Sequence, residues 1–279
     1  MASKSRSHPL ATLLAAAALV SGIVSAQTPP APATAAAAPE PDWTLTGNVG
    51  LFSQYVFRGV SQTNEKPAVQ GGFDLGHKSG LYAGTWASNI SWLSDGSPNV
   101  SASLEWDVYG GYKGSLPADF GYDVGVLYYW YPGSYPPGYV LPNTTELYGA
   151  LTWKWLSLKY SWSANNKTFG VPDSRGSGYL DLTANYDIVE KVSDAIGKVT
   201  LTGHVGRQWY KGSTHDINVS HSNSDLGYTD WKLGASTEVY GVTVGLFVTD
   251  TNANDALYTN QFGKKIAGTQ VVGYLQKTF

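Results

Sequence analysis

Three kinds of feature are scarce in this sequence, and each shortage excludes something. The chain of 279 residues contains no cysteine, which excludes disulfides, thiolate nucleophiles and cysteine-ligated metals. Charged residues make up 14% of it, against about 25% in ordinary soluble domains. From Trp43 onward, no stretch approaches the ~18 consecutive apolar residues of a membrane-spanning helix. The net charge is −3 and no basic cluster is present, so nucleic acid is excluded as a partner.

Residues that favour β-strands are abundant instead. Aromatic residues make up 13% of the chain, mostly tyrosine and tryptophan, and glycine occurs 32 times. Tyrosine, tryptophan, threonine and valine are enriched in strands, whereas strong helix formers are scarce after the first forty residues. The composition therefore predicts an all-β protein.

The N-terminal 42 residues differ from the rest and predict an exported protein. A basic start is followed by the apolar run 10–20, "LATLLAAAALV", and by "VSA" ending at Ala26, a pattern typical of a signal peptide. Residues 27–42 are rich in proline and alanine and are expected to form a disordered linker. We therefore expect a signal peptide over 1–26 and one exported β domain over 43–279, which the patterns below predict to be an outer-membrane β-barrel.

Apolar and polar side chains alternate along most of the chain after Trp43. In 156–163, "LSLKYSWS", every second residue is apolar, which indicates a strand with one face in an apolar solvent and one in water. Similar segments predict about twelve strands, with ten to fourteen possible. Their ranges are 43–58, 68–77, 81–89, 100–112, 120–131, 145–153, 156–163, 180–187, 199–209, 229–239, 242–249 and 268–279.

Long and short connections follow one another between these segments. The long ones are polar and rich in glycine, proline, asparagine and serine, and the short ones include 78–80, 154–155 and 240–241; the segment 188–198 is a longer exception. Antiparallel up-and-down barrels of outer membranes have short periplasmic turns and long outer loops, whereas a soluble sandwich has no reason to sort its loops in this way. The pattern therefore favours a transmembrane up-and-down barrel.

Charges are confined to one face of the predicted strands. A lysine or arginine on the lipid face costs about 2–4 kcal/mol at the bilayer midplane, so the charged face is expected to line the lumen. The expected pore-lining residues, with His204 of the same face, are Arg58, Asp74, Glu105, Asp107, Lys113, Asp123, Glu146, Lys159, Asp181, His204, Asp230, Lys232 and Glu238. Eight acids against four bases predict a mild preference for cations.

Aromatic residues on the opposite face cluster toward the strand ends. Tyrosine and tryptophan favour the membrane interface because their rings are apolar and their tips are polar. The expected girdle comprises Tyr55, Phe57, Tyr112, Tyr128, Trp130, Trp153, Trp162, Tyr186 and Trp231. In "SQYVFRGVSQT", the period of two thus turns Tyr55 and Phe57 toward lipid and Arg58 toward water at the mouth of the lumen.

The expected dimensions suit a membrane. A ten-residue strand tilted by ~40° spans ~26 Å, close to an apolar band of ~25 Å. Twelve strands close a ring ~24 Å across at the backbone and leave a lumen on the order of 10 Å, which inward-folding loops would narrow. The chain ends in Phe279, and a terminal strand that closes on an aromatic residue is typical of outer-membrane barrels, where it serves as an assembly signal.

The stretch from Thr46 to Ile90 resembles the TorF-type porins of proteobacteria. The resemblance rests on "GNVGLFSQYVFRGVSQT" and "KPAVQGGFDLGHKSGLYAGTWASNI", and continues in "LEWDVYGGY", "YDVGVLYYWYPG", "GYLDLTANYD" and the closing "KTF". It covers nearly all of the chain from Trp43. It implies an outer-membrane barrel that passes small solutes, and it assigns no residue a role.

Three functions remain open at this stage. The favoured one is a porin-like channel for passive diffusion of small hydrophilic solutes or ions, without catalytic residues, cofactor or metal. His204 keeps a barrel hydrolase of lipids or peptides as an alternative, because such enzymes use Ser–His or Asp–His pairs; a closed structural or adhesive barrel is the third. His215, Asp216 and His221 match no structural zinc pattern, and their segment is expected to be a polar outer loop. The expected partners are outer-membrane lipid and lipopolysaccharide, the barrel assembly machinery and small hydrophilic solutes.

Overall fold

The computed structural model describes residues 41–215 and 220–279. The expected signal peptide lies outside these residues, as do the linker up to residue 40 and Asp216. The side chains of residues 215–221 are likewise outside the description.

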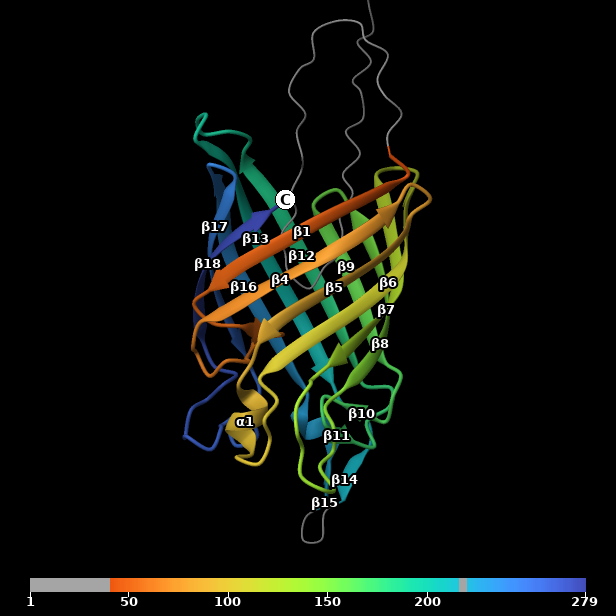
Figure 1. Ribbon diagram of the computed structural model, residues 1–279, viewed down its shortest axis with the longest axis vertical. Helices are drawn as coiled ribbons and strands as arrows, with labels where there is room; N and C mark the ends of the chain where they lie inside the picture. Colours follow the sequence, from red (N-terminus) through yellow and green to blue (C-terminus); the bar gives the residue numbers. More distant parts are fainter. Residues whose placement is uncertain (1–40, 216–219) are drawn as a thin grey trace, which may run out of the picture.

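Twelve antiparallel strands form a closed barrel in which each strand pairs with the next and the last returns to the first (Figure 1). Both the all-β class and the count of twelve barrel strands are confirmed. The strands are β1 (Trp43–Phe52), β4 (Ala68–His77), β5 (Leu81–Asn89), β6 (Leu104–Leu116), β7 (Phe120–Trp130), β8 (Thr144–Trp153), β9 (Leu156–Ser163), β12 (Gly178–Val189), β13 (Ile196–Trp209), β16 (Tyr228–Val239), β17 (Val242–Thr251) and β18 (Gln270–Thr278).

Small elements occupy the long connections, which gather at the lower end of the barrel in Figure 1, whereas the short turns lie at the upper end. They are β2 (Val56–Phe57), β3 (Val60–Ser61), α1 (Trp92–Gly96), β10 (Lys167–Thr168), β11 (Val171–Pro172), β14 (Ser213–His215), β15 (Ser220–Ser222) and the 3-10 turn η1 (Asn223–Leu226). Within the described part of the chain, no helix is long and apolar enough to cross a membrane.

Two predicted strand boundaries are wrong. The first strand was expected over 43–58, but β1 ends at Phe52, and the next residues leave the barrel wall. The fourth was expected over 100–112, but β6 begins at Leu104 and runs to Leu116. Val100 and Ala102 alternate like strand residues because they are buried in a cluster of loop residues at this end of the barrel, not because they pair in the sheet.

The barrel closes where β1 meets β18, with Leu51 opposite Leu275. Gly47 and Phe279 extend this seam through two reciprocal backbone hydrogen bonds of 2.8 and 2.9 Å. A Cβ on Gly47 would lie 2.6 Å from the Phe279 ring, so the glycine makes room for the terminal side chain. The last residue thus completes the seam; its role as an assembly signal stays a prediction.

The outer surface is apolar and the interior is polar. On β8, Leu147 is 48% exposed while its neighbour Glu146 is 1% exposed, and this contrast repeats around the ring. Exposed apolar side chains on the strands include Leu51, Phe73, Val108, Val126, Leu158, Leu182, Leu201, Leu233, Leu246 and Leu275. Seven of the nine expected girdle residues lie on this outer face: Tyr112, Tyr128, Trp130, Trp153, Tyr186 and Trp231, which are exposed, and Trp162, half-buried opposite Leu147.

Candidate functional site

The connection after β1 folds back on itself as a short hairpin, which we call the lumen hairpin (residues 55–62). Its strands β2 and β3 are joined by Arg58 and Gly59, whose φ values are 48° and 78°. Positive φ at both central residues is the mark of a type I′ turn, whose twist matches that of a hairpin. The Gln62 N–H donates to the Tyr55 carbonyl at 2.8 Å and closes the neck.

The lumen hairpin reaches strands on opposite sides of the barrel. The Tyr55 hydroxyl donates to Glu105 Oε1 on β6 at 2.8 Å. The Arg58 guanidinium donates to Glu146 on β8 and to Gln208 on β13, both at 2.8 Å. Gln270 Nε2 on β18 donates to the Gly59 carbonyl at 3.3 Å. Because these strands are spread around the ring, the hairpin crosses the lumen and narrows it.

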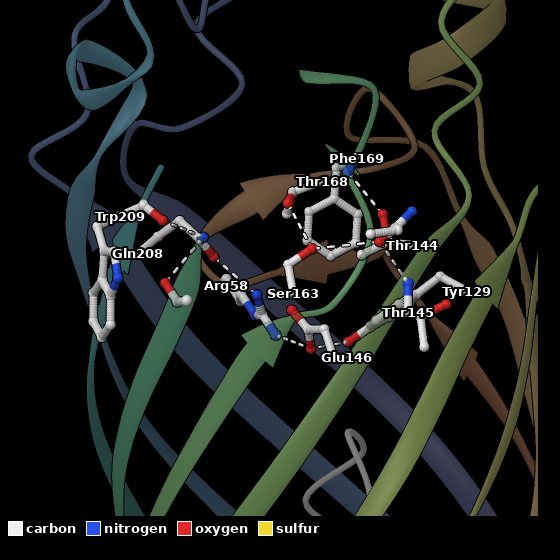
Figure 2. Close-up of polar contacts among 12 residues, drawn as sticks. Arg58, Tyr129, Thr144, Thr145, Glu146, Ser163, Thr168, Phe169, Gln208 and Trp209 are labelled. Carbon is white, nitrogen blue, oxygen red and sulfur yellow. Dashed lines mark hydrogen bonds and ion pairs between the residues drawn. The ribbon is translucent and has the colours of Figure 1, made fainter. Parts of the chain in front are cut away.

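The centre of this crossing is the ion pair between Arg58 and Glu146 (Figure 2). Their side chains are only 5% and 2% exposed. The Tyr129 hydroxyl also donates to Glu146, at 3.1 Å, and the guanidinium carbon lies 4.2 Å from the centre of the Tyr179 ring. Burial, the largest single effect, lowers the pKa of Arg58, but the charge and hydrogen bond of Glu146 together with Tyr129 and Tyr179 outweigh it and hold that pKa above its ordinary value. Arg58 therefore stays charged inside the barrel.

Neighbouring loops hold the neck of the lumen hairpin. The Gln62 carbonyl accepts from the N–H groups of Ser91 and Trp92, in the connection after β5. The Ser61 N–H donates to the Ile266 carbonyl, in the connection after β17. Two outer loops thus fix the hairpin from the rim, and its tip is fixed from the wall.

A second hairpin, which we call the rim hairpin (residues 166–173), comprises β10 and β11. It turns at Phe169 and Gly170, whose φ values are 51° and 83°. The Phe169 N–H donates to Thr144 Oγ1 at 2.7 Å (Figure 2). The centre of the Phe169 ring lies 5.7 Å from that of the Phe57 ring. The rim hairpin therefore packs on the lumen hairpin from the outer side.

The expectation that Tyr55 and Phe57 face lipid is wrong. Tyr55 is 8% exposed with its hydroxyl on Glu105, and Phe57 packs edge-on against Tyr129 inside the barrel. The period of two assigns a side only while the chain stays in the wall. After Phe52 it leaves the wall, and both faces of the lumen hairpin point into the interior.

His204, on β13, lies between two carboxylates of the neighbouring strands β12 and β16. Its Nε2 is 2.9 Å from Asp230 and its Nδ1 is 3.2 Å from Asp181. The Tyr179 hydroxyl donates to Asp230 at 2.9 Å, and Thr183 Oγ1 lies 3.1 Å from Nδ1 while donating to Asp181. Both ring nitrogens of His204 thus have carboxylate partners. The hydroxyls of Tyr179 and Thr183, which lie beside the ring, donate their protons to Asp230 and Asp181.

The remaining predicted pore-lining residues are largely held by tyrosines that the sequence reasoning missed. The Tyr82 hydroxyl donates to Asp123 at 2.6 Å and contacts the Tyr148 hydroxyl. Tyr109 donates to Asp74 at 2.7 Å. Lys113 and Lys159 lie over the Tyr82 and Tyr148 rings, at 5.2 and 4.0 Å from the ring centres. Asp107 is buried beside this group, Lys232 lies 5.4 Å from the centre of the Phe247 ring, and Glu238 is exposed near the short-turn end.

Inward tyrosines lie over glycines of the neighbouring strand. A Cβ at Gly111 would lie 2.7 Å from the Tyr82 hydroxyl, and one at Gly125 would lie 2.5 Å from that of Tyr148. The glycines let the rings lie along the wall instead of projecting across the lumen. This pairing of inward tyrosine with inward glycine was the available sequence signal, but it requires the register between strands.

Across residues 41–215 and 220–279, no three histidine, cysteine or acidic side chains are grouped so as to hold a metal ion. What the interior offers is a wall of carboxylates, ammonium groups and phenols. That wall suits the passage of polar solutes.

Comparisons with known proteins give one family model and several similar solved structures. A family model described as "Bacterial protein of unknown function (Gcw_chp)" matches residues 36–279. No curated protein matches the chain. The solved structures similar to it include the KdgM porin (11% identity, 84% of this chain and 99% of that one, TM-score 0.49) and the NanC porin (13%, 84% and 98%, 0.46). OprD of Pseudomonas aeruginosa is also similar (12%, 84% and 66%, 0.39).

Proposed function

We propose a function for this chain from the premise that it belongs to the Gcw_chp family of bacterial proteins, whose description supplies no activity. It is an outer-membrane channel for passive diffusion of small hydrophilic solutes or ions, narrowed by the lumen hairpin. It acts without chemistry on its solute. The TorF-type resemblance agrees with this proposal and remains a prediction.

The observation that carries the proposal is the inversion of the barrel's two faces. A water-soluble barrel hides its apolar side chains, whereas this one exposes residues such as Leu233 (59%) and Leu246 (58%) and buries Glu105 and Asp230 (1% each). Strands of about ten residues at ~3.4 Å per residue, tilted as in known barrels, match an apolar band of ~25 Å. A lipid bilayer therefore suits the outer face, and water suits the inner one.

The charges of the lumen support a mild preference for cations. Among the predicted pore-lining residues, acids outnumber bases eight to four, and one of the four bases, Arg58, is paired with Glu146. Rings of carboxylates favour cations in channels by stabilising them where they lose part of their water.

Planar-bilayer recording of the refolded mature protein tests the proposal. We expect stepwise currents whose reversal potential in a potassium chloride gradient shifts toward the cation. Heat-dependent mobility in SDS gels serves as the control for folding. A correctly folded barrel that stays silent would refute the channel, and a shift toward the anion would refute the selectivity.

A hydrolase remains the second candidate because His204 contacts Asp230 in the manner of a catalytic pair. Against it, the Thr183 hydroxyl donates to Asp181 rather than toward the ring. We expect His204→Ala to leave the stepwise currents in place. Loss of a lipid or peptide hydrolysis on that substitution, in a silent barrel, would favour the enzyme.

A further inference from the structure

A cavity lies inside the barrel against the lumen hairpin. Gln54 and Tyr55 of the connection after β1 form one side of it. A second side comes from β4, β5 and β18, at Gln70, Trp86 and Gln276, and a third comes from β13, β16 and β17, which include Lys232 and Phe247. A polar side chain and an aromatic side chain thus recur on each of its sides.

Two glutamines flank one glycine on the inner face of the wall. Gly50 on β1 pairs with Gln70 on β4 and with Gln276 on β18, so the two glutamines flank it at one level. Neighbouring strands lie about 4.8 Å apart, which separates the two backbones by roughly 10 Å. Two side chains that leave the wall at this separation can both reach the hydroxyl groups of one ring-shaped solute.

Neither amide is used by the protein. Within the described ranges, the Gln70 and Gln276 side chains make no hydrogen bond, although the residues are only 5% and 8% exposed. The indole Nε1 of Trp86, on the adjacent strand, is also buried without a partner. The two amides are therefore available to a bound solute, whose hydroxyl groups would replace water on them.

The floor between the amides is aromatic. A Cβ on Gly50 would lie 2.6 Å from the Phe52 ring, so that ring covers the glycine. It stacks on Tyr274 with ring centres 5.2 Å apart and planes 13° apart. Flat aromatic faces contact the C–H faces of solutes, and amides both donate and accept hydrogen bonds.

We propose that this cavity is a binding subsite for a polyhydroxylated solute of the size of one or two sugar rings. The aromatic floor contacts the C–H face of the ring. The amides of Gln70 and Gln276, which each offer donors and an acceptor, bond its hydroxyl groups from both sides. This inference deepens the channel proposal and rests on it, because the subsite lies in the path that the solute would take.

Sugar-induced current block tests the subsite. Glucose and maltose are added to the wild-type channel in a planar bilayer, with polyethylene glycol of matching size as a control for volume and glucuronate as a control for charge. We expect maltose to interrupt the current at concentrations where the polymer does not. In Gln70→Leu/Gln276→Leu the half-blocking concentration should rise about tenfold, the loss of two hydrogen bonds. Trp86→Phe, which removes the N–H together with part of the aromatic surface, should have a smaller effect.

A matched control uses the same chemical change outside the cavity, at the exposed Gln261. Gln261→Leu should block like the wild type. Equal block of wild type and double variant, or block by glucuronate alone, would overturn the subsite while leaving the channel standing. A silent barrel whose micelles bind maltose saturably, with loss in the double variant, would retain the subsite and refute the channel.

Discussion

The lumen hairpin and the rim hairpin have the same turn and opposite surroundings. Both turn on a bulky residue and a glycine with positive φ, Arg58–Gly59 and Phe169–Gly170. The first is tied by a buried ion pair and hydrogen bonds to strands across the barrel, whereas the second is tied mainly to the adjacent β8 and β9. The turn thus sets the shape of a hairpin, and the tip residue sets where it lies.

The largest expected effect comes from removing each hairpin. Replacing Val56–Ser61 by two glycines keeps the hydrogen bond from the Gln62 N–H to the Tyr55 carbonyl and removes the segment that crosses the lumen. The single-channel conductance should therefore rise several-fold. The same replacement over residues 167–172 should change the conductance little, because the rim hairpin does not cross the lumen. Equal changes in both variants would contradict the distinction.

The ion pair at the tip should give the next largest effect. Arg58→Glu places a second carboxylate beside Glu146, and breaking a buried pair costs about 3–5 kcal/mol. We expect the hairpin to leave the lumen, with faster amide hydrogen exchange over residues 55–62, higher conductance and stronger cation preference.

Arg58→Met/Glu146→Met serves as the matched control, because well-packed apolar side chains often replace a buried pair at no cost. It should restore slow exchange over the lumen hairpin. Slow exchange in Arg58→Glu itself, with unchanged conductance, would show that the pair does not hold the hairpin.

The barrel was predictable from the sequence because its causes are local and periodic. Alternation of side chains gave the twelve strands, and the alternation of long and short connections gave their up-and-down order. The period of two alone then predicts that Glu105 points into the barrel and that Leu147 points out of it.

The crossing of the lumen was not predictable in the same way. "YVFRGVS" continues the alternation of β1, and Arg-Gly is a weaker turn signal than Asn-Gly or Asp-Gly. The partners of Arg58 are 88 and 150 residues away, at Glu146 and Gln208. Their contact requires the register of strands on the far wall, which one sequence does not provide. That Gln70 and Gln276 flank Gly50 was not predictable either, because it also requires the register between strands.

The two turn glycines give the smallest and sharpest comparison. Alanine at φ near +80° costs about 1–2 kcal/mol in either hairpin, so Gly59→Ala and Gly170→Ala share this strain. Around Gly170, a new Cβ would meet nothing nearer than 3.5 Å. At Gly59 it would lie 2.4 Å from Thr251 Cγ2 and 2.8 Å from Asp230 Cβ.

Gly59→Ala should therefore speed amide exchange at Gln62 more than Gly170→Ala speeds it at Ser174. Adding Thr251→Ser removes the clashing methyl group and keeps the hydroxyl that donates to Ala267, so it should recover part of the loss at Gln62. No recovery, or equal losses in the two single variants, would mean that the tip of the lumen hairpin does not press on the wall. The hairpin would then be a loop that lies within the barrel without being built into it.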